Sequence, residues 1–490
     1  LASSAASDVY KRQYIYCCGG YIMKKLNEII DCDLDTLIYG ISDDSRDICE
    51  GYLFVATRGF NVDHFDYIDK AIENGAVAVI CDREIDFDIP HVIVKKDINK
   101  LYPELCEKFY GVDTSKLSLI GITGTDGKTT SATIVQKILN DSINCAYIGT
   151  NGLFVNGDTH HISNTTPCVS ELYDCLSTIQ DNSCQKVVME VSSEALLHER
   201  IQGLKFSIVA ITNITEDHLN VHKTIENYRQ CKFKIVDYLT DNGVAIINGD
   251  DENCRSLHVN NLIKFGFNSD NDYVISDFVE DQNGVKFRIR HNDSTYDISS
   301  QLFGKYNAYN ITLAFIIGLL NKIDADTLIS RIKVISFITG RGERLDFGQK
   351  FEIILDYAHT YNAILNLLNS VKGKYNRVIT VTGAAGGREK EKRSKIGKMV
   401  LEKSDLVIFT MDDPRWESVD DIIDDMIGEC KNTNYERIND RVEAITHAFE
   451  IANEGDAVLV IGKGRDDYMA LGTEKIPYCD YDVIKNYFAK

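Results

Sequence analysis

Short apolar runs alternate with helix-length amphipathic segments along most of the chain. The first runs lie at 53–55, 76–80 and 91–94, and a helical pattern at 67–74 separates the first two. Apolar runs of this length are typical of buried strands, and their alternation with helices is typical of a parallel sheet. The pattern therefore predicts a small α/β domain in this part of the chain.

The same alternation continues beyond two polar breaks. The first break is the turn-prone segment 111–115, and the second is Gly340-Arg341-Gly342-Glu343-Arg344. Buried strands are expected at 117–122, 187–191, 208–212, 353–356, 378–382, 406–410 and 457–461, with a strand-rich insertion around 255–300. We therefore predict an α/β protein whose C-terminal part is a third, doubly wound sheet.

Length and breaks together predict three domains, because 490 residues far exceed the roughly 150 of an ordinary domain. The expected bounds are 23–115, 116–338 and 339–490. Residues 1–22 are set apart as a non-native leader. Within them, 1–13 (LASSAASDVYKRQ) resembles the translation of a sequencing-adapter remnant, and Met23 resembles a true start.

Composition excludes several classes of protein. Subtracting 74 acidic from 53 basic residues gives a net charge of −21, which argues against general affinity for nucleic acid or an anionic membrane. The sequence contains no apolar run of about 18 residues, so no membrane-spanning helix is expected. Fourteen cysteines are scattered without a paired framework, which favours free thiols in a reducing cytoplasm. We expect a cytoplasmic monomer.

The strongest local motif is GITGTDGKTT, from Gly121 to Thr130, between an apolar run and a helical pattern. Glycines let backbone N–H groups turn around phosphate oxygens, Lys128 supplies a mobile positive charge, and the Thr129 hydroxyl can hold Mg²⁺. A glycine-rich surface turn is the alternative, and the strand-to-helix position argues against it. Ile122 stands where the longer form of this motif has glycine, so the loop has the shorter Gly-Thr-x-Gly-Lys-Thr form.

Further motifs follow the same order as in one known family. They are Asp44-Ser45-Arg46, Asn164-Thr165-Thr166-Pro167, Met189-Glu190-Val191-Ser192-Ser193, Thr212-Asn213 with Glu216-Asp217-His218-Leu219, Asp356-Tyr357-Ala358-His359-Thr360 and Asp412-Asp413-Pro414-Arg415. With the phosphate loop, they make the chain from about residue 23 onward resemble the Mur ligases, closest to the MurE-type branch. The resemblance implies an N-terminal UDP-substrate-binding domain, a central P-loop ATPase domain and a C-terminal Rossmann-like amino-acid-binding domain.

The resemblance also implies a reaction. ATP would phosphorylate a carboxylate of UDP-N-acetylmuramoyl-L-alanyl-D-glutamate, and the amine of an incoming amino acid would attack the acyl phosphate, with Mg²⁺ neutralising charge. The implied catalytic residues are Lys128, Glu190, His218 and Lys232. The implied metal ligands are Thr129, Glu190, His218 and, once carbamylated, Lys232. Alone, Glu190 and His218 would more often be structural, and an ordinary solvated Lys232 is the alternative to a carbamylated one.

Two further sets of residues carry over from the family. The implied ATP contacts are Gly124, Thr125, Asp126, Gly127, Lys128, Thr129, Thr130, Asn310, Arg341 and Asp356. The implied contacts to the two substrates are Ser45 on the uridine side, and Asn164, Thr165, Thr166, Ser192, His198, Arg200, Arg388, Asp412, Asp413, Pro414, Arg415, Gly462 and Asp466 on the side of the muramoyl peptide and the amino acid. Closure of the C-terminal domain is expected to exclude water from the acyl phosphate.

The chain departs from the family pattern at several positions. Glu194 stands where the family has histidine, and His198 where it has glutamine. The acceptor motifs read Asp-Asp-Pro-Arg and Gly-Lys-Gly-Arg-Asp, against Asp-Asn-Pro-Arg and Gly-Lys-Gly-His-Glu in diaminopimelate enzymes. Arg388 and Arg415 favour diaminopimelate, whereas the charge of Asp413 favours a cationic acceptor such as L-lysine, and the balance leans slightly to diaminopimelate.

Three alternative interpretations follow. The basic run 388–395 is expected to be a solvated helix start apart from Arg388. The chain could be another amide ligase of the superfamily, such as a folylpolyglutamate synthetase or cyanophycin-type enzyme, and the N-terminal Asp44-Ser45-Arg46 argues against the former. It could also be a catalytically weakened, nucleotide-binding regulatory homologue, against which the intact Lys128, Thr129, Glu190, His218 and Lys232 argue.

Overall fold

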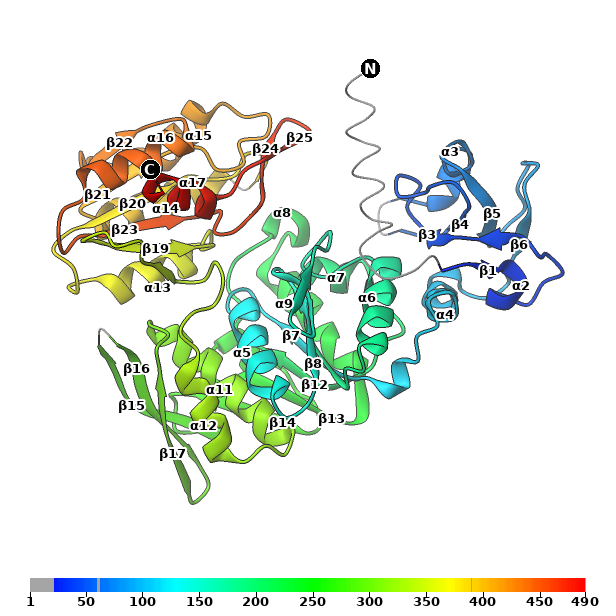
Figure 1. Cartoon of the computed structure of the whole chain (residues 1–490), viewed down its shortest axis with the longest axis horizontal. Helices are drawn as coiled ribbons and strands as arrows, with labels where there is room; N and C mark the ends of the chain where they lie inside the picture. The colour runs from blue at the N-terminus through cyan, green and yellow to red at the C-terminus, as the bar shows by residue number, and fades with distance from the viewer. Residues whose placement is uncertain (1–21, 60–61, 282, 389, 490) are drawn as a thin grey trace.

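A computed structural model describes residues 22–59, 62–281, 283–388 and 390–489 (Figure 1). The leader expected at 1–22 lies outside these ranges except for its last residue. Three large sheets follow one another along the described chain, with two small two-stranded sheets beside them, and Figure 1 shows the first large sheet at one end of the molecule and the C-terminal unit next to the central one. Within the described ranges, no helix has both the length and the apolar character to cross a membrane. Every cysteine there is a free thiol, as expected.

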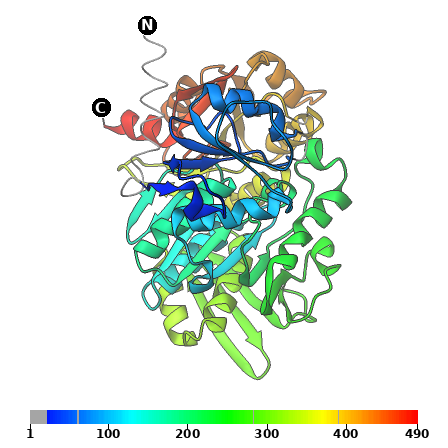
Figure 2. The same cartoon turned by 90° about the vertical axis from the view of Figure 1, so that its right-hand side faces the viewer.

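The N-terminal unit, blue and turned toward the viewer in Figure 2, contains a parallel four-stranded sheet in the order β3-β4-β5-β6. Its elements are β3 (Gly40–Ser42), β4 (Tyr52–Val55), α3 (Ile68–Glu73), β5 (Ala76–Cys81), β6 (His91–Ile93) and α4 (Ile98–Tyr110), preceded by β1 (Lys24–Lys25), α2 (Leu26–Ile29) and β2 (Leu37–Ile38). Asp97 caps α4 by accepting from the N–H of Asn99, and Gly111 ends it in the left-handed region at φ 69°. The expected strands and intervening helix are confirmed.

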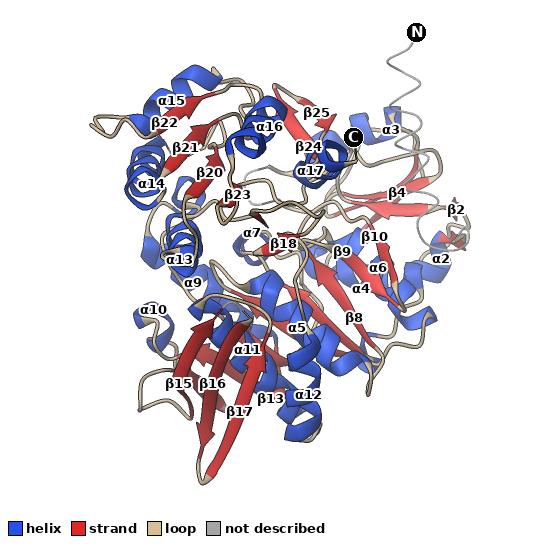
Figure 3. Ribbon diagram, turned by 60° about the vertical axis from the view of Figure 1, so that its left-hand side comes forward, coloured by secondary structure: helices blue, strands red, loops and turns tan. Residues whose placement is uncertain are grey.

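The central unit is an 11-stranded sheet in the order β10-β9-β8-β11-β7-β12-β13-β14-β15-β16-β17. Its parallel strands include β7 (Ser118–Thr123), β8 (Cys145–Gly149), β11 (Lys186–Glu190), β12 (Phe206–Ile211), β13 (Leu239–Asn248) and β14 (Leu262–Gly266). Strands β9 (Gly152–Val155) and β10 (Asp158–His160) form one edge, and β15 (Tyr273–Asp281), β16 (Gly284–His291) and β17 (Ser294–Ser300) form a ribbon at the other (Figure 3). The ribbon is the expected strand-rich insertion.

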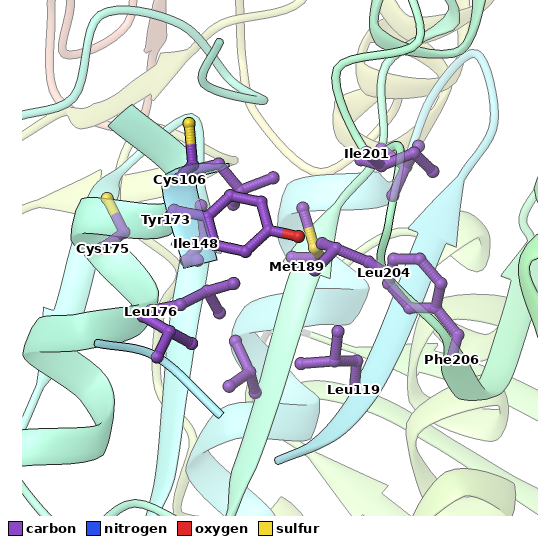
Figure 4. Close-up of a cluster of buried hydrophobic side chains, with 14 of the residues drawn as sticks. Cys106, Leu119, Ile148, Tyr173, Cys175, Leu176, Met189, Ile201, Leu204 and Phe206 are labelled. Atoms are coloured by element: carbon purple, nitrogen blue, oxygen red, sulfur yellow. The ribbon is translucent and has the colours of Figure 1, made fainter. Parts of the chain in front are cut away.

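Helices cover both faces of the central sheet. One face packs against α4, α6 (Val169–Asp181), α7 (Ser193–Leu197) and α9 (Ile225–Phe233), and the other against α5 (Lys128–Asn140), α11 (Lys305–Leu320) and α12 (Ala325–Val334). In the first core, Leu119, Met189 and Phe206 of neighbouring strands meet Tyr173 of α6 (Figure 4). This packing fixes the register of β7, β11 and β12, so their carboxyl ends form one edge. The short helices α8 (Leu219–His222) and α10 (Glu252–Arg255) follow β12 and β13.

The C-terminal unit is a six-stranded sheet in the order β18-β19-β23-β20-β21-β22, parallel except for β18. Its strands are β18 (Glu343–Leu345), β19 (Glu352–Asp356), β20 (Val378–Thr382), β21 (Leu406–Phe409), β22 (Tyr435–Arg437) and β23 (Ala457–Ile461), followed by the hairpin β24 (Tyr468–Leu471) and β25 (Glu474–Pro477). Helices α13 (Tyr361–Val371), α14 (Lys390–Lys403) and α15 (Val419–Ile427) pack on one face, and α16 (Arg441–Ile451) and α17 (Asp480–Phe488) on the other. This is the expected doubly wound sheet.

The start of α14 corrects one expectation. Arg393 is not solvated, because its side chain is 2% exposed and its Nη1 donates to Glu417 and Asp425 at 2.8 Å each. Lys392 reaches the central unit, where its Nζ lies 2.8 Å from Asp217 Oδ1. The interpretation of 388–395 as a solvated helix start is therefore wrong for these two residues. A guanidinium can be buried where two carboxylates compensate its charge.

Candidate functional site

A cavity of about 680 Å³ lies where the carboxyl edge of the central sheet faces the C-terminal unit. It contains most residues for which the sequence predicted a role. The expected residues that line it are Thr125, Asp126, Gly127, Lys128, Thr129, Thr130, Asn164, Thr165, Thr166, Glu190, Ser192, Arg200, His218, Asn310, Arg341, Asp356 and Arg388.

Other expected residues lie outside the lining of this cavity. They are Ser45, Gly124, His198, Lys232, Asp412, Asp413, Pro414, Arg415, Gly462 and Asp466. Ser45 belongs to the N-terminal unit, and the last six belong to two loops at the carboxyl ends of β21 and β23. The structure therefore brings the phosphate loop, the metal-ligand candidates and part of the substrate set together, and keeps the acceptor motif apart from them.

The phosphate loop turns sharply between β7 and α5. Gly124 and Gly127 have φ of 146° and 83°, a region that side chains with a Cβ rarely adopt. A Cβ on Gly127 would also lie 2.6 Å from Asn310 Oδ1. Helix α5 starts directly at Lys128, so its first-turn N–H groups have no partners within the helix and form an anion-binding end.

Lys128 is folded back onto its own loop. Its Nζ donates to the carbonyl oxygens of Gly124 at 2.9 Å and Thr125 at 2.8 Å. Burial lowers the pKa of Lys128, while nearby carboxylates, Glu190 first among them, oppose that shift. The ammonium group is thus held by neutral carbonyl groups that can release it to a stronger anionic partner.

Glu190, the last residue of β11, is fully buried and bonded through both carboxylate oxygens. Its Oε1 accepts from Tyr147 Oη at 2.5 Å and from the N–H of Thr150 at 3.0 Å. Its Oε2 accepts from Thr129 Oγ1 at 2.9 Å and more weakly from Thr150 Oγ1 at 3.4 Å. Oε1 is therefore held in place by two protein donors, whereas Oε2 lies next to the Thr129 hydroxyl.

His218 lies between two carboxylates at the mouth of the same edge. Its Nε2 is 3.4 Å from Asp217 Oδ2 and its Nδ1 is 3.7 Å from Glu194 Oε1. Burial lowers the pKa of His218, and Asp217 and Glu194 work against that shift. Burial alone would raise the pKa of Asp217, but His218, His359 and Lys392 together bring it below its usual value. Glu194 therefore lies beside a histidine, while 43% of its side chain remains exposed to solvent.

Lys232 is a buried lysine beneath the phosphate loop. Its residue is 1% exposed, and its Nζ donates to the carbonyl oxygen of Gly124 at 2.8 Å. The ammonium lies 4.5 Å from the ring centroid of Tyr228, one turn earlier on α9. Burial, helped by Lys128, lowers the pKa of Lys232 well below its ordinary value. The alternative of an ordinary solvated lysine is therefore wrong.

Three polar contacts join the C-terminal unit to the central site. Arg341 Nη2 donates to Thr129 Oγ1 at 3.1 Å, Thr360 Oγ1 donates to Asp126 Oδ1 at 3.1 Å, and Lys392 pairs with Asp217. The guanidinium of Arg341 also lies 4.6 Å from the ring centroid of Tyr357. The two units are thus in contact across the cavity.

The acceptor motif forms a second polar cluster around Lys463. This side chain is 1% exposed, and its Nζ lies 2.8 Å from Asp413 Oδ1 and 3.3 Å from Asp466 Oδ2. Burial raises the pKa of Asp466 to about 6. Arg415 is held at φ 53°, with its N–H donating to Ala470 and its carbonyl accepting from Gly472. Asp413 is therefore not a free negative charge.

The sequence analysis gave no role to four residues that shape the site: Tyr147, Thr150, Asn213 and Thr360, although Asn213 and Thr360 belong to the motifs quoted there. Thr150 and Asn213 follow the carboxyl ends of β8 and β12, and Thr360 follows that of β19. That position was the available signal, because ligands gather at the carboxyl ends of parallel strands. Tyr147 lies inside a buried strand and gave no such signal.

Comparison with known families returns one family along nearly the whole chain. The model of the Mur ligase family catalytic domain matches residues 37–117, that of the Mur ligase middle domain 122–318, and that of the Mur ligase glutamate ligase domain 340–464. The resemblance drawn from the motifs is confirmed.

Curated relatives agree with these matches. The UDP-N-acetylmuramoyl-L-alanyl-D-glutamate--2,6-diaminopimelate ligase of Bacillus cereus is 34% identical over 460 residues, covering 91% of this chain and 93% of the relative. The enzyme of the same name from Fusobacterium nucleatum is 34% identical over 464 residues, with 93% and 95% covered.

Solved structures show the same fold. A UDP-N-acetylmuramoyl-L-alanyl-D-glutamate--2,6-diaminopimelate ligase aligns with a TM-score of 0.63 and 25% identity, covering 95% of this chain and 99% of that one. MurF ligase from Thermotoga maritima, in complex with ADP, aligns with a TM-score of 0.62 and 20% identity over 86% and 93%. The expected α/β, three-domain Mur ligase architecture is confirmed.

Proposed function

The chain belongs to the Mur ligase family, and from that premise we propose that it is an ATP- and Mg²⁺-dependent amide ligase of peptidoglycan synthesis. It would add meso-diaminopimelate to UDP-N-acetylmuramoyl-L-alanyl-D-glutamate, the reaction named for relatives that match more than nine-tenths of this chain. The observation that carries the proposal is the buried Thr129–Glu190 pair beside Lys128, with Arg341 of the other unit on the same hydroxyl.

The Thr129–Glu190 pair fits a magnesium ion. Thr129 Oγ1 and Glu190 Oε2 lie 2.9 Å apart, and both are the hard oxygen donors that Mg²⁺ prefers. In the described part of the chain, no group of three His, Cys, Asp or Glu side chains is placed to hold a metal unaided. Nucleotide phosphates and water would complete the shell, which is how Mg²⁺ is usually bound. The bound ion would neutralise phosphate charge.

Lys232 and His218 are proposed to serve a second ion. A lysine must be neutral to react with CO₂, and burial beside Lys128 favours the neutral amine of Lys232. The resulting carbamate would be a carboxylate-like ligand on the carbonyl side of the phosphate loop, next to Gly124. His218 lines the cavity and offers a ring nitrogen that is now 3.4 Å from Asp217.

The residues of the cavity support an acyl-phosphate route. Lys128 and the N-terminus of α5 would hold the ATP phosphates, and Arg341 would reach them from the C-terminal unit. The substrate carboxylate would take the γ-phosphoryl group with release of ADP, and the acceptor amine would then displace phosphate to form the amide. Thr166 and Arg200, joined at 3.1 Å, would position the muramoyl peptide beside Glu190. Contact between the two units would keep water from the acyl phosphate.

Two features support a dicarboxylic acceptor. Lys463 offsets the charge of Asp413, which removes the main argument from the sequence for a purely cationic acceptor. Arg388 lines the cavity, and Arg415 lies in the acceptor loop, so two guanidinium groups are available for a carboxylate. We therefore favour meso-diaminopimelate over L-lysine.

The test is phosphate release from ATP by the purified chain with Mg²⁺ and UDP-N-acetylmuramoyl-L-alanyl-D-glutamate. The panel of acceptors is meso-diaminopimelate, L-lysine and L-ornithine. We expect release that depends on meso-diaminopimelate, with the amide product identified by mass. Dependence on L-lysine alone would keep the ligase and overturn the acceptor. If no acceptor stimulates release while ATP still binds, the regulatory interpretation replaces the ligase.

A further inference from the structure

Asp126 is an acidic residue in the middle of the phosphate loop, and its backbone is fully engaged by the protein. Its N–H donates to Asn213 Oδ1 at 2.9 Å, and its carbonyl oxygen accepts from Thr212 Oγ1 at 2.6 Å and Asn213 Nδ2 at 3.0 Å. The residue is therefore fixed to the segment that follows β12. Its amide hydrogen, unlike those of the first turn of α5, is not available to a phosphate oxygen.

The carboxylate of Asp126 points to the other unit. Both of its oxygens accept from Thr360 Oγ1, at 3.1 and 3.2 Å. Thr360 is also the N-cap of α13, where its hydroxyl accepts from the N–H of Ala363 at 3.1 Å. The Thr360 residue is 5% exposed. Its single hydroxyl group thus joins the phosphate loop to the start of a helix in the C-terminal unit.

The position of this carboxylate matters because it lines the cavity beside Lys128 and Thr129. An anionic side chain at a phosphate-binding end repels phosphate unless a donor or a cation takes up its charge. Lys128 and His359 are the cationic or titratable groups that act most strongly on Asp126, and Asp217 adds a like charge. Lys128 is needed by the phosphates themselves, whereas His359 and Thr360 both belong to the C-terminal unit, and Thr360 is the one that donates a hydrogen bond to the carboxylate.

We propose that Asp126 makes phosphate binding depend on closure of the C-terminal unit, with Thr360 as its partner. When the units are apart, the carboxylate has lost its donor and opposes the triphosphate. When they close, Thr360 draws the carboxylate toward α13, and Arg341 reaches Thr129 at the same time. Asp126 is thus a positioning residue that ties tight ATP binding to the unit carrying the acceptor loops. The inference rests on the proposed ATP site.

The test measures binding of a non-hydrolysable ATP analogue with Mg²⁺ to four full-length chains: wild type, Asp126→Asn, Thr360→Val and the double variant. Asp126→Asn keeps the size of the side chain and an acceptor for Thr360 but removes the charge, so the analogue should bind about threefold tighter or more. Thr360→Val in the wild-type background should weaken binding about tenfold, and in the Asp126→Asn background less than about twofold.

The double-mutant comparison separates a role of Thr360 in phosphate binding from its structural role as a helix cap. Thr360→Val also removes the cap of α13, but that loss is common to both backgrounds and cancels in the double-mutant comparison. Thr360→Ser keeps the hydroxyl and should bind the analogue as the wild type does. Thermal unfolding of each variant checks that the chain is folded.

Three outcomes would overturn the inference. The first is binding of the analogue by Asp126→Asn no tighter than by the wild type, which would show that the Asp126 charge does not repel phosphate. The second is an equal loss of binding by Thr360→Val in both backgrounds, which would leave Thr360 as a helix cap only. The third is a wild-type chain that binds no analogue, which would overturn the ATP site as well. If the wild type binds the analogue and Asp126→Asn binds it equally well, only the role of Asp126 is overturned.

Discussion

At the carboxyl edge of the central sheet, Glu190 is buried among neutral donors, whereas at the carboxyl edge of the C-terminal sheet Asp413 and Asp466 share one buried lysine. Glu190 receives hydrogen bonds from Tyr147, Thr150 and Thr129. Lys463 instead places a full positive charge 2.8 Å from Asp413. Both arrangements satisfy the carboxylates, which are fully buried at Glu190 and partly buried at Asp413 and Asp466, but only the first leaves the negative charge available to a cation.

This difference suggests what each edge can bind. Hydroxyl groups such as that of Thr129 can turn from a carboxylate and join it in holding a metal ion, so the central edge suits Mg²⁺ and phosphate. An internal ion pair is costly to open, so Lys463 offsets only part of the charge of Asp413 and Asp466, and the acceptor edge must select its ligand with the remaining groups, such as Arg415. The predictions below test this contrast.

Lys128→Ala should give the largest effect. Removal of the ammonium from the phosphate loop is expected to lower kcat by a factor of about 10³ or more, as loss of a preorganised charge does. Phosphate release under the full substrate mixture measures it. Lys137→Ala, at an exposed lysine on the same helix α5, is the matched control and should turn over normally. Equal turnover by both variants would contradict the central-edge role.

Lys463→Met should weaken the fold rather than the phosphate chemistry. It leaves the partly buried Asp413 and Asp466 without their counter-charge, which is expected to cost up to about 3 kcal/mol of unfolding free energy. Denaturant unfolding measures the loss. The double variant Lys463→Met with Asp413→Asn should recover part of it, because the stranded charge is gone. No recovery would show that Lys463 acts by packing alone.

Tyr147→Phe should raise the Mg²⁺ concentration that is needed for activity at the central edge. Without the phenol hydroxyl, Glu190 Oε1 keeps only the N–H of Thr150, and the Mg²⁺ concentration for half-maximal activity should rise about tenfold, the value of a hydrogen bond to a charged group. A titration of Mn²⁺ binding gives a second readout. Tyr173→Phe, in the core shown in Figure 4, should leave both values unchanged.

Asp466→Asn should give the smallest effect, visible in the pH dependence of stability. Burial raises the pKa of Asp466 to about 6, so between pH 4 and 6 the folded chain binds this proton more tightly than the unfolded chain. The stabilisation is full below pH 4 and is lost as pH rises through 6. Unfolding free energies across this range should fall less steeply in Asp466→Asn. An unchanged slope would mean that Lys463 keeps Asp466 ionised throughout.

Much of the fold could be predicted from local pattern alone. The runs 117–122, 187–191 and 208–212 are the adjacent strands β7, β11 and β12, because a continuous apolar run can only be satisfied inside a covered sheet. The phosphate loop could also be predicted, because the spacing of its glycines and lysine is typical of that loop geometry. Tyr147 was not, because a tyrosine in an apolar strand has the same appearance whether or not its hydroxyl finds a carboxylate.

The sequence by itself determined which strands form, where the phosphate loop lies and which family the motifs resemble, because those properties depend on residues close together in the chain. The tertiary structure alone decided that Arg393 is buried, that Lys463 neutralises Asp413, and that Thr360 meets Asp126, 234 positions away. The sequence shows which side chains are ionisable. The partner and the burial of each one are set by packing between segments that are distant in the chain. Those two quantities decide how much of each charge a ligand can use.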